Sequence, residues 1–172
     1  SINYAWKIQD SLLPNSDLVD ELLPNSFVFF KPKDKVSGDF FWVGEKDDHV
    51  FFSVADCTGH GIPGAFMSML GTALLNEVVI EKGVHKVDEI LETMRSRLIR
   101  GLHQDGEKVK TMDGLDISLL SYDPKTKGGW SQDGRKVRGT IHWVCAQKAI
   151  DAQIKIYNKL FNQINPFDLT NG

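Results

Sequence analysis

The sequence predicts an α+β fold: an antiparallel sheet of about five to seven strands with two helices packed on one face. Three observations lead to this fold class. Short runs of aromatic and β-branched residues recur along the chain, as strands require. Two long amphipathic stretches follow the third of these runs. Strand-like and helix-like segments are grouped rather than regularly alternating, which is typical of α+β proteins.

The composition is that of a globular protein. The chain has 172 residues, of which 41% are hydrophobic and 25% charged, enough for one ordinary domain. Its apolar runs fall short of the ~20 residues that a membrane helix needs, and no signal segment opens it, so we expect no membrane partner. Two cysteines cannot build a disulfide scaffold, so we expect a cytoplasmic protein.

The N-terminal third predicts one helix and three strands. Residues 1–13 have the spacing of an amphipathic helix that stops before Pro14. Residues 15–26 are polar and read as a connection, with room for a short turn around 18–23. The strands that follow are expected at 27–31, 39–43 and 50–55, with Asp47-Asp48 as the hairpin turn between the last two, which predicts an antiparallel meander.

Two helices and a further strand come next. Residues 63–81 carry one apolar stripe with Pro63 in the first turn, and residues 87–102 carry a second. The second stripe has acidic residues at its start and arginines toward its end, which suits the helix dipole. After a polar loop, residues 116–122 have the pattern of another strand.

The last quarter of the chain differs from the rest. Residues 125–134 are rich in glycine and polar side chains without periodicity, and mark a candidate boundary. Residues 137–145 and 153–161 alternate apolar and polar side chains and predict a β-hairpin with a basic outer face. The net charge of −3 is unevenly distributed: the part of the chain up to Asp123 is acidic, and the part after it is basic. Such asymmetry suggests two parts with different partners, or chance segregation on one surface.

Two aspartates stand at the edges of predicted strands. Asp39 precedes one apolar run, and Asp56 ends another and opens the glycine-rich turn 57–61. Glycines let a loop fold tightly enough to aim carbonyl and carboxylate oxygens at one point, and hard divalent cations prefer such oxygen clusters. Residues 36–66 therefore read as part of a metal site. The alternatives are a turn cap for Asp39 and an Asx-turn or helix cap for Asp56.

A family resemblance supports the metal site. Residues 1–123 resemble the N-terminal part of a bacterial PPM-type serine/threonine phosphatase domain, in the subgroup related to the sporulation stage II E and sigma-regulator phosphatases. The resemblance is carried, in order, by IQDSLLP, FKPKDKVSGDFFWV, VADCTGHGIPGAFMSMLG and DGLDISLLSYD.

That resemblance implies a reaction and a set of ligands. It implies two Mn²⁺ or Mg²⁺ ions that hold an attacking water, hydrolysis of phosphoserine or phosphothreonine proteins, and no certain catalytic side chain. The metal ligands would be Asp39, Asp56 and the backbone carbonyl of Cys57. The residues that would shape the loops around them are Gly38, Gly59 and Gly61.

Four other residues near these motifs invite functional interpretations. His60 could be a general acid, but a surface-loop role is favoured. The Cys57 thiol could be a nucleophile, but without a histidine partner at suitable spacing a small buried thiol is favoured. Asp113 and Asp116 could be metal ligands, but a turn carboxylate and a strand-edge residue are favoured.

The resemblance to the phosphatases stops at Lys125. The later Ser-Asp-Gly motif and the last metal aspartate of that family do not follow, so we expect weak or absent activity. Instead, residues 133–167 resemble the start of the anticodon-binding β-barrel region of a glutaminyl-tRNA synthetase, through GRKVRGTIHWV and IKIYNKLF. This implies weak tRNA or polyanion binding, or else merely a solvated basic face. The candidate contacts are Arg135, Lys136, Arg138 and Lys155.

The two resemblances together predict a chimera, either a fusion or an engineered recombination. We expect a truncated phosphatase-like segment at 1–124, a glycine-rich junction at 125–134, and a barrel-like hairpin with a tail at 135–172, possible partners in one packed domain. A third functional hypothesis is a folded chimera with no native biochemical role. Exposed strand edges would then favour a homodimer.

Overall fold

The computed structural model describes residues 2–24, 26–32, 34–104, 113–125, 128–130, 136–138 and 155–158. The order of elements is α1 (Ile2–Leu12), α2 (Ser16–Leu22), β1 (Ser26–Phe29), β2 (Phe40–Lys46), β3 (His49–Cys57), α3 (Gly61–Leu75), η1 (Asn76–Glu81), α4 (Val87–Gly101), β4 (Leu115–Asp123), β5 (Gly128–Trp130), β6 (Lys136–Arg138) and β7 (Lys155–Asn158). The α+β fold class is confirmed.

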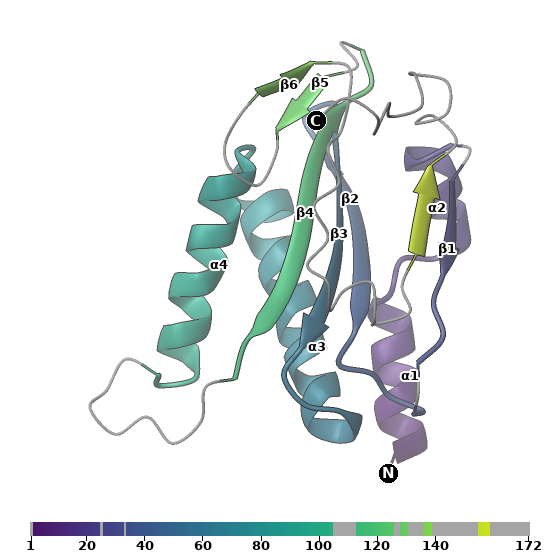
Figure 1. Ribbon diagram of the computed structural model, residues 1–172, viewed down its shortest axis with the longest axis vertical. Helices are drawn as coiled ribbons and strands as arrows, with labels where there is room; N and C mark the ends of the chain where they lie inside the picture. Colours follow the sequence, from purple (N-terminus) through teal and green to yellow (C-terminus); the bar gives the residue numbers. More distant parts are fainter. Residues whose placement is uncertain are drawn as a thin grey trace, which may run out of the picture.

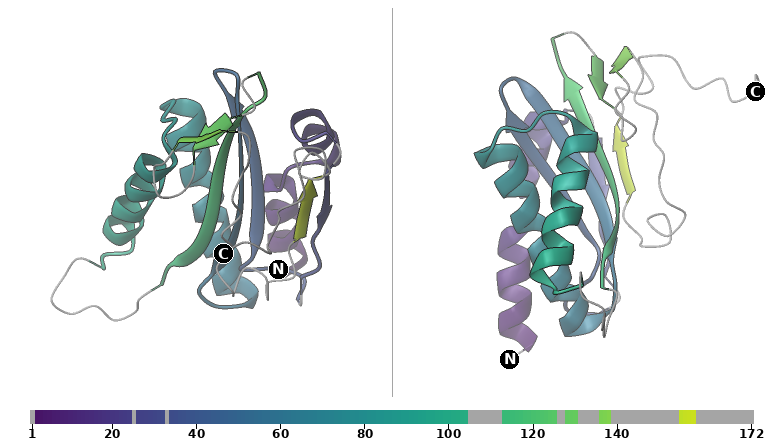
Figure 2. Two further views of the ribbon diagram at one scale, coloured as in Figure 1. Left: turned by 45° about the horizontal axis from the view of Figure 1, so that its top comes forward. Right: turned by 90° about the vertical axis from the view of Figure 1, so that its left-hand side faces the viewer.

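The centre of the fold is an antiparallel five-stranded sheet in the order β2-β3-β4-β5-β6. Helices α3 and α4 lie together on one face of it, and α1 lies beside α3 on the same side (Figures 1 and 2). The two helices of the sequence prediction therefore cover one face, as expected.

Both faces of the sheet are buried because its strands alternate apolar side chains toward two separate cores. Phe40, Trp42 and Phe51 point to the core under the helices, where residues of α3, η1 and α4 pack against them. Phe41 and Phe52 belong to the second core on the opposite face, which α2 and β1 help to cover. Strands β2 and β3 are therefore packed on both faces.

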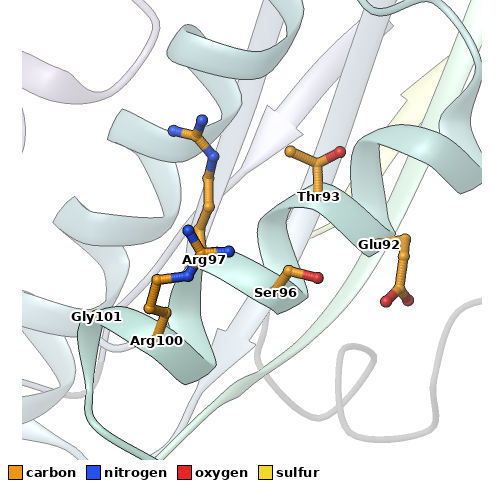
Figure 3. Close-up of a pocket in the computed structure, with 6 residues that line it drawn as sticks. All are labelled: Glu92, Thr93, Ser96, Arg97, Arg100 and Gly101. Carbon is orange, nitrogen blue, oxygen red and sulfur yellow. The ribbon is translucent and has the colours of Figure 1, made fainter.

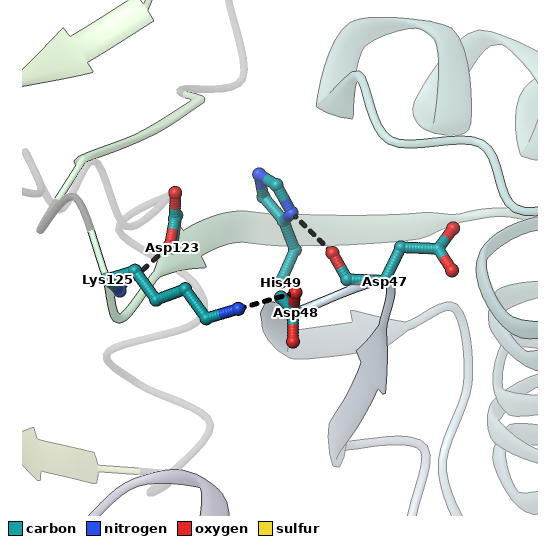
Figure 4. Close-up of polar contacts among 5 residues, drawn as sticks. All are labelled: Asp47, Asp48, His49, Asp123 and Lys125. Atoms are coloured by element: carbon teal, nitrogen blue, oxygen red, sulfur yellow. Dashed lines mark hydrogen bonds and ion pairs between the residues drawn. The ribbon is translucent and has the colours of Figure 1, made fainter.

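The β2–β3 hairpin turns at the predicted pair of aspartates. Asp47 and Asp48 have φ values of 49° and 64°, the pair of positive angles that a type I′ turn requires. Lys125 ties this tip to the end of β4, since its Nζ donates to Asp48 Oδ2 at 2.7 Å and its backbone N donates to Asp123 Oδ1 at 2.8 Å (Figure 4). The His49 ring Nδ1 lies 3.1 Å from the Asp47 carbonyl oxygen.

The long apolar helix changes its winding part-way. The α-helical hydrogen-bond pattern of α3 gives way at Asn76 to the wider π pattern of η1, and Lys82 N donates to Glu77 O at 2.9 Å. Gly83, at φ +65°, follows directly after the last turn of this helix. By length and composition alone, Gly61–Glu81 could cross a membrane, but 56% of its apolar 18-residue window is buried inside the protein, as in a core helix.

Two predictions for the N-terminal third are wrong. Residues 15–26 are not simply a connection, because Ser16–Leu22 forms helix α2, capped by the Asn15 side chain, which accepts from Leu18 N. The meander is also incomplete, because β1 does not join β2. It pairs with β7 in a separate two-stranded sheet. The expected pairing of residues 27–31 with 39–43 therefore does not occur. Strand β1 pairs instead with a strand that is distant in the sequence, which local patterns do not specify.

The described residues of the last quarter show pairings that the sequence did not predict. The glycine-rich junction contains a strand, since β5 pairs with β4. The expected hairpin of 137–145 with 153–161 does not form between its described residues. Strand β6 pairs with β5, whereas β7 pairs with β1. The remaining residues of that hairpin, and the expected tail at 162–172, lie outside the described part of the chain.

Candidate metal centre

Asp39 and Asp56 meet at one end of the central sheet. In the β2–β3 register Phe40 pairs with Ala55, so Asp39, directly before β2, lies beside Asp56 near the end of β3. Both residues are half-buried. Strand β3 is paired with β2 as far as Ala55 and with β4 through Asp56 itself, so the backbone of Asp56 is held in the sheet.

The two carboxyl groups are close enough to hydrogen-bond, and this changes the chemistry of Asp39. Burial raises the pKa of Asp39 from 3.8 to about 7, with further contributions from the negative charge of Asp56 and from the hydrogen bond between them. Two carboxylates in this position repel each other when both are ionised. A divalent cation relieves that repulsion, so the pair fits a hard metal ion.

The glycine-rich turn brings backbone oxygens to the same place. Gly59 and Gly61 have φ values of +88° and +62°, which side-chain-bearing residues rarely adopt. A Cβ on Gly38 would lie 2.7 Å from the Gly59 carbonyl oxygen and 3.2 Å from the Cys57 carbonyl oxygen. The turn therefore packs directly on the segment that carries Asp39, and only glycine at position 38 permits this approach.

The turn is also fixed from the other side, by the start of β4. Thr58 N donates to Gly114 O at 2.9 Å, and Gly114 N donates to Thr58 Oγ1 at 3.1 Å. Directly beyond, Asp116 pairs with Asp56 in the β3–β4 register. Asp116 lies near the start of β4, and the described pairing of β4 with β5 reaches only Ser121–Asp123, which agrees with the edge position expected for it. Asp113 precedes β4, and its carbonyl accepts from Gln104 Nε2 at 2.9 Å.

The segment before Asp39 is held by a buried amide that the sequence did not single out. Gln9 of α1 is 7% exposed, and its amide accepts from Ser37 N at 2.9 Å while donating to Ser37 O at 2.6 Å. Ser37 Oγ in turn accepts from Asp39 N at 3.0 Å. In the sequence, Gln9 looks like one more position of an amphipathic helix. Its place among the apolar residues of the predicted stripe is the one signal that could have revealed it.

Cys57 and His60 occupy the places that the sequence favoured. Cys57 is buried, and burial followed by the charges of Asp56 and Asp39 raises the pKa of its thiol to about 12. Such a thiol is protonated at neutral pH and is not a nucleophile. His60 is on the surface with its side chain 94% exposed, 3.9 Å from Asp34 Oδ2.

We also searched the described part of the chain for candidate binding sites away from the aspartate pair. Within those residues, no group of three or more His, Cys, Asp or Glu side chains could hold a metal ion. A surface hollow of about 550 Å³ lies along α4 around Arg97 and Arg100 (Figure 3), but none of its lining residues belongs to the aspartate pair. Arg97 is paired with Glu77 of η1.

The described basic candidates at the C-terminal end belong to strands of two different sheets. Lys136 and Arg138 lie on β6, in the five-stranded sheet, whereas Lys155 lies on β7, in the two-stranded sheet. Arg135 is outside the described residues. The expected single basic hairpin is therefore not assembled from these strands.

Comparison with known proteins explains the first part of the chain. Residues 46–128 match the family model of stage II sporulation protein E (SpoIIE). The SiaA-PP2C domain of Pseudomonas aeruginosa has a similar structure, with a TM-score of 0.64 and 30% identity over 74% of this chain. The first part of the chain is SpoIIE/PP2C-like. This chain covers 49% of the SiaA-PP2C chain.

A second group of relatives matches a short segment only. The glutamine–tRNA ligase of Clostridium kluyveri is 53% identical over 55 residues, which are 31% of this chain and 10% of the ligase. That of Xanthomonas oryzae is 38% identical over 73 residues, which are 42% of this chain and 13% of the ligase. A SpoIIE/PP2C-like segment joined to a short ligase-like segment is consistent with a chimera.

Proposed function

We propose that the SpoIIE/PP2C-like segment binds Mn²⁺ or Mg²⁺ at the aspartate pair and acts weakly as a phosphoserine and phosphothreonine protein phosphatase. The observation that carries the proposal is the juxtaposition of Asp39 and Asp56, whose mutual repulsion contributes to raising the pKa of Asp39 to about 7. In the absence of a ligand such an arrangement costs stability, and it is retained where a cation is bound.

Each residue of the pair has a defined task. Asp56, on a strand paired at both sides, supplies a rigid oxygen donor. Asp39 supplies the facing donor, and the Cys57 carbonyl lies against the preceding residue, Gly38, which has no side chain. A bound divalent cation would stabilise negative charge on phosphoryl oxygens. The surrounding half-buried position limits competing water and strengthens the electrostatic interaction.

The donor set also explains why we propose weak activity. Two carboxylates and a backbone carbonyl fill about half of the six places around Mn²⁺ or Mg²⁺, so water completes the coordination. Affinity falls with each charged oxygen that is missing. A second ion at a catalytic separation would be held more weakly still.

Hydrolysis of a generic aryl phosphate ester tests this proposal. With millimolar Mn²⁺ we expect slow turnover that Asp56→Ala abolishes and that Asp34→Ala, which removes an exposed carboxylate outside the pair, leaves unchanged. Turnover that is equal in all three proteins would mark a contaminating activity. No turnover above background in the unaltered chain would leave the segment as a scaffold.

A second function is favoured by the ligase matches. We propose as the alternative that the ligase-like segment binds tRNA or another polyanion through Arg135, Lys136, Arg138 and Lys155, or that the chimera has no native role. Salt-sensitive binding of tRNA that is lost in the double variant Arg135→Ala/Arg138→Ala would favour polyanion binding. A homodimer formed through free strand edges would appear in light scattering as twice the monomer mass.

A further inference from the structure

Helix α1 is connected to the aspartate pair through a single buried side chain. The helix packs beside α3 and on the same side of the sheet (Figure 2). Gln9 is its one buried residue, and the amide reaches across to the loop that precedes β2. A buried amide is costly unless its donors and acceptor are satisfied, so its hydrogen bonds determine where the partner segment lies.

All parts of this amide are in use. Oε1 accepts from Ser37 N, and Nε2 donates both to Ser37 O and to Ser68 Oγ, the latter at 2.7 Å. Ser68 belongs to α3, is 2% exposed, and lies within hydrogen-bond distance of Ser37 O and Ala65 O. Gln9 therefore joins three elements: α1, α3 and the loop before β2.

The loop transmits this constraint to the metal-site residue within two positions. Ser37 is held at both its backbone N–H and its carbonyl, and its hydroxyl holds the backbone N–H of Asp39. Gly38, between them, is pressed against the Cys57 and Gly59 carbonyl oxygens. A shift of Ser37 would therefore move the Asp39 carboxylate relative to Asp56.

We propose that Gln9 is a positioning residue that sets the distance between the Asp39 and Asp56 carboxylates by clamping the backbone of Ser37. Its effect on cation affinity rests on the metal site proposed above. Its effect on the loop does not, since these hydrogen bonds join residues of the chain itself. Residues that orient metal ligands in this way typically change metal affinity by about 10–100-fold when replaced.

Gln9→Met provides the test, because methionine keeps the length and the packing of the side chain but makes none of the three hydrogen bonds. Val19→Ala is the matched control: it alters a buried residue of α2 in the opposite core and does not touch the loop. The first measurement is amide hydrogen exchange in the metal-free proteins. The second is calorimetric titration with Mn²⁺.

In Gln9→Met we expect the amides of Ser37 and Asp39 to exchange at least about tenfold faster, relative to the Phe52 amide of β3 as an internal standard. We expect its Mn²⁺ dissociation constant to rise by about 10–100-fold. Val19→Ala should leave both the Ser37-to-Phe52 ratio and the Mn²⁺ affinity unchanged, even where it lowers global stability.

Other outcomes overturn the proposal. Unchanged exchange at Ser37 and Asp39 shows that Gln9 does not hold the loop. Faster exchange with unaltered Mn²⁺ affinity shows that the clamp does not position Asp39. If the unaltered protein itself fails to bind Mn²⁺, the proposed metal site falls, and exchange alone then decides whether Gln9 positions the loop. Should Gln9→Met not fold, Ser68→Ala, which removes one partner of the amide, replaces it, with about threefold effects in the same direction expected.

Discussion

Removing one carboxylate of the pair should stabilise the metal-free protein. In Asp39→Asn the amide carries no charge, so it neither suffers the burial cost of an ionised group nor repels Asp56. The same change removes an oxygen donor for a cation. We therefore expect Asp39→Asn to increase stability without Mn²⁺ and to abolish the stabilisation that Mn²⁺ produces, two effects of opposite sign from one substitution.

The pH dependence of stability gives the sign and the size of the contribution that Asp39 makes to the free energy of unfolding. The pKa of Asp39 is 3.8 in the unfolded reference and about 7 in the folded chain, mainly because of burial and then the charge of Asp56. Below pH 3.8 both states hold the proton and nothing is lost. Between pH 3.8 and 7 the folded state holds more protons, so the free energy of unfolding falls as the pH rises. The full shift corresponds to about 4 kcal/mol. Because Asp39 is half-exposed, solvent screening reduces this to about 1–2 kcal/mol.

Urea unfolding between pH 4 and pH 8, with and without chelator, measures these effects. At pH 7.5 in chelator, Asp39→Asn should be more stable than the unaltered chain by about 1–2 kcal/mol, and the difference should vanish near pH 4. Excess Mn²⁺ at about 100 times its dissociation constant should stabilise the unaltered chain by about 2.7 kcal/mol and leave Asp39→Asn unchanged. Glu45→Gln, an exposed position on β2, is the control. A less stable Asp39→Asn in chelator would refute the reasoning.

Three further predictions concern the surroundings of the pair. Gly38→Ala should lower the free energy of unfolding by about 1–3 kcal/mol, because its Cβ would meet two carbonyl oxygens at 2.7 and 3.2 Å. Gly101→Ala, with open space at its Cβ, should raise the free energy of unfolding by about 0.5–1 kcal/mol. Urea melts measure both changes. Native Cys57 should resist iodoacetamide at pH 8 and react in urea, since its thiol is buried and has a pKa of about 12. Mass spectrometry of the Cys57 peptide measures this, and labelling of the native protein would contradict the prediction. Trp42→Phe should lower the free energy of unfolding by about 1 kcal/mol, because it loses the 2.9 Å hydrogen bond from Nε1 to Asn76 Oδ1. An unchanged urea melt would show that this bond does not stabilise the fold.

The sequence predicts the parts of this fold whose cause is local. Apolar periodicity locates α3 and α4, and the Asp47-Asp48 pair locates the hairpin turn, because these features depend on neighbouring residues alone. The sequence also predicts that Asp39 and Asp56 belong to one site, because both stand at strand ends and because the motifs around them resemble a known family. The structure then supplies the register that places one beside the other.

The features that were missed depend on partners distant in the sequence. The partner of β1 is β7, more than a hundred residues away, and no local pattern identifies it. The glycine-rich stretch that contains β5 has the composition of a linker, yet it pairs with β4 because that strand offers a free edge. Gln9 is polar and stands in an amphipathic helix, so its burial depends entirely on Ser37 and Ser68.

Calorimetric titration of Mn²⁺ into the unaltered chain and into Asp56→Ala tests the central claim most directly, which is that the two carboxylates form a cation site. We predict measurable heat and a raised melting temperature for the unaltered chain, and neither for Asp56→Ala. Identical titrations for the two proteins, whether both bind or neither does, would contradict the claim.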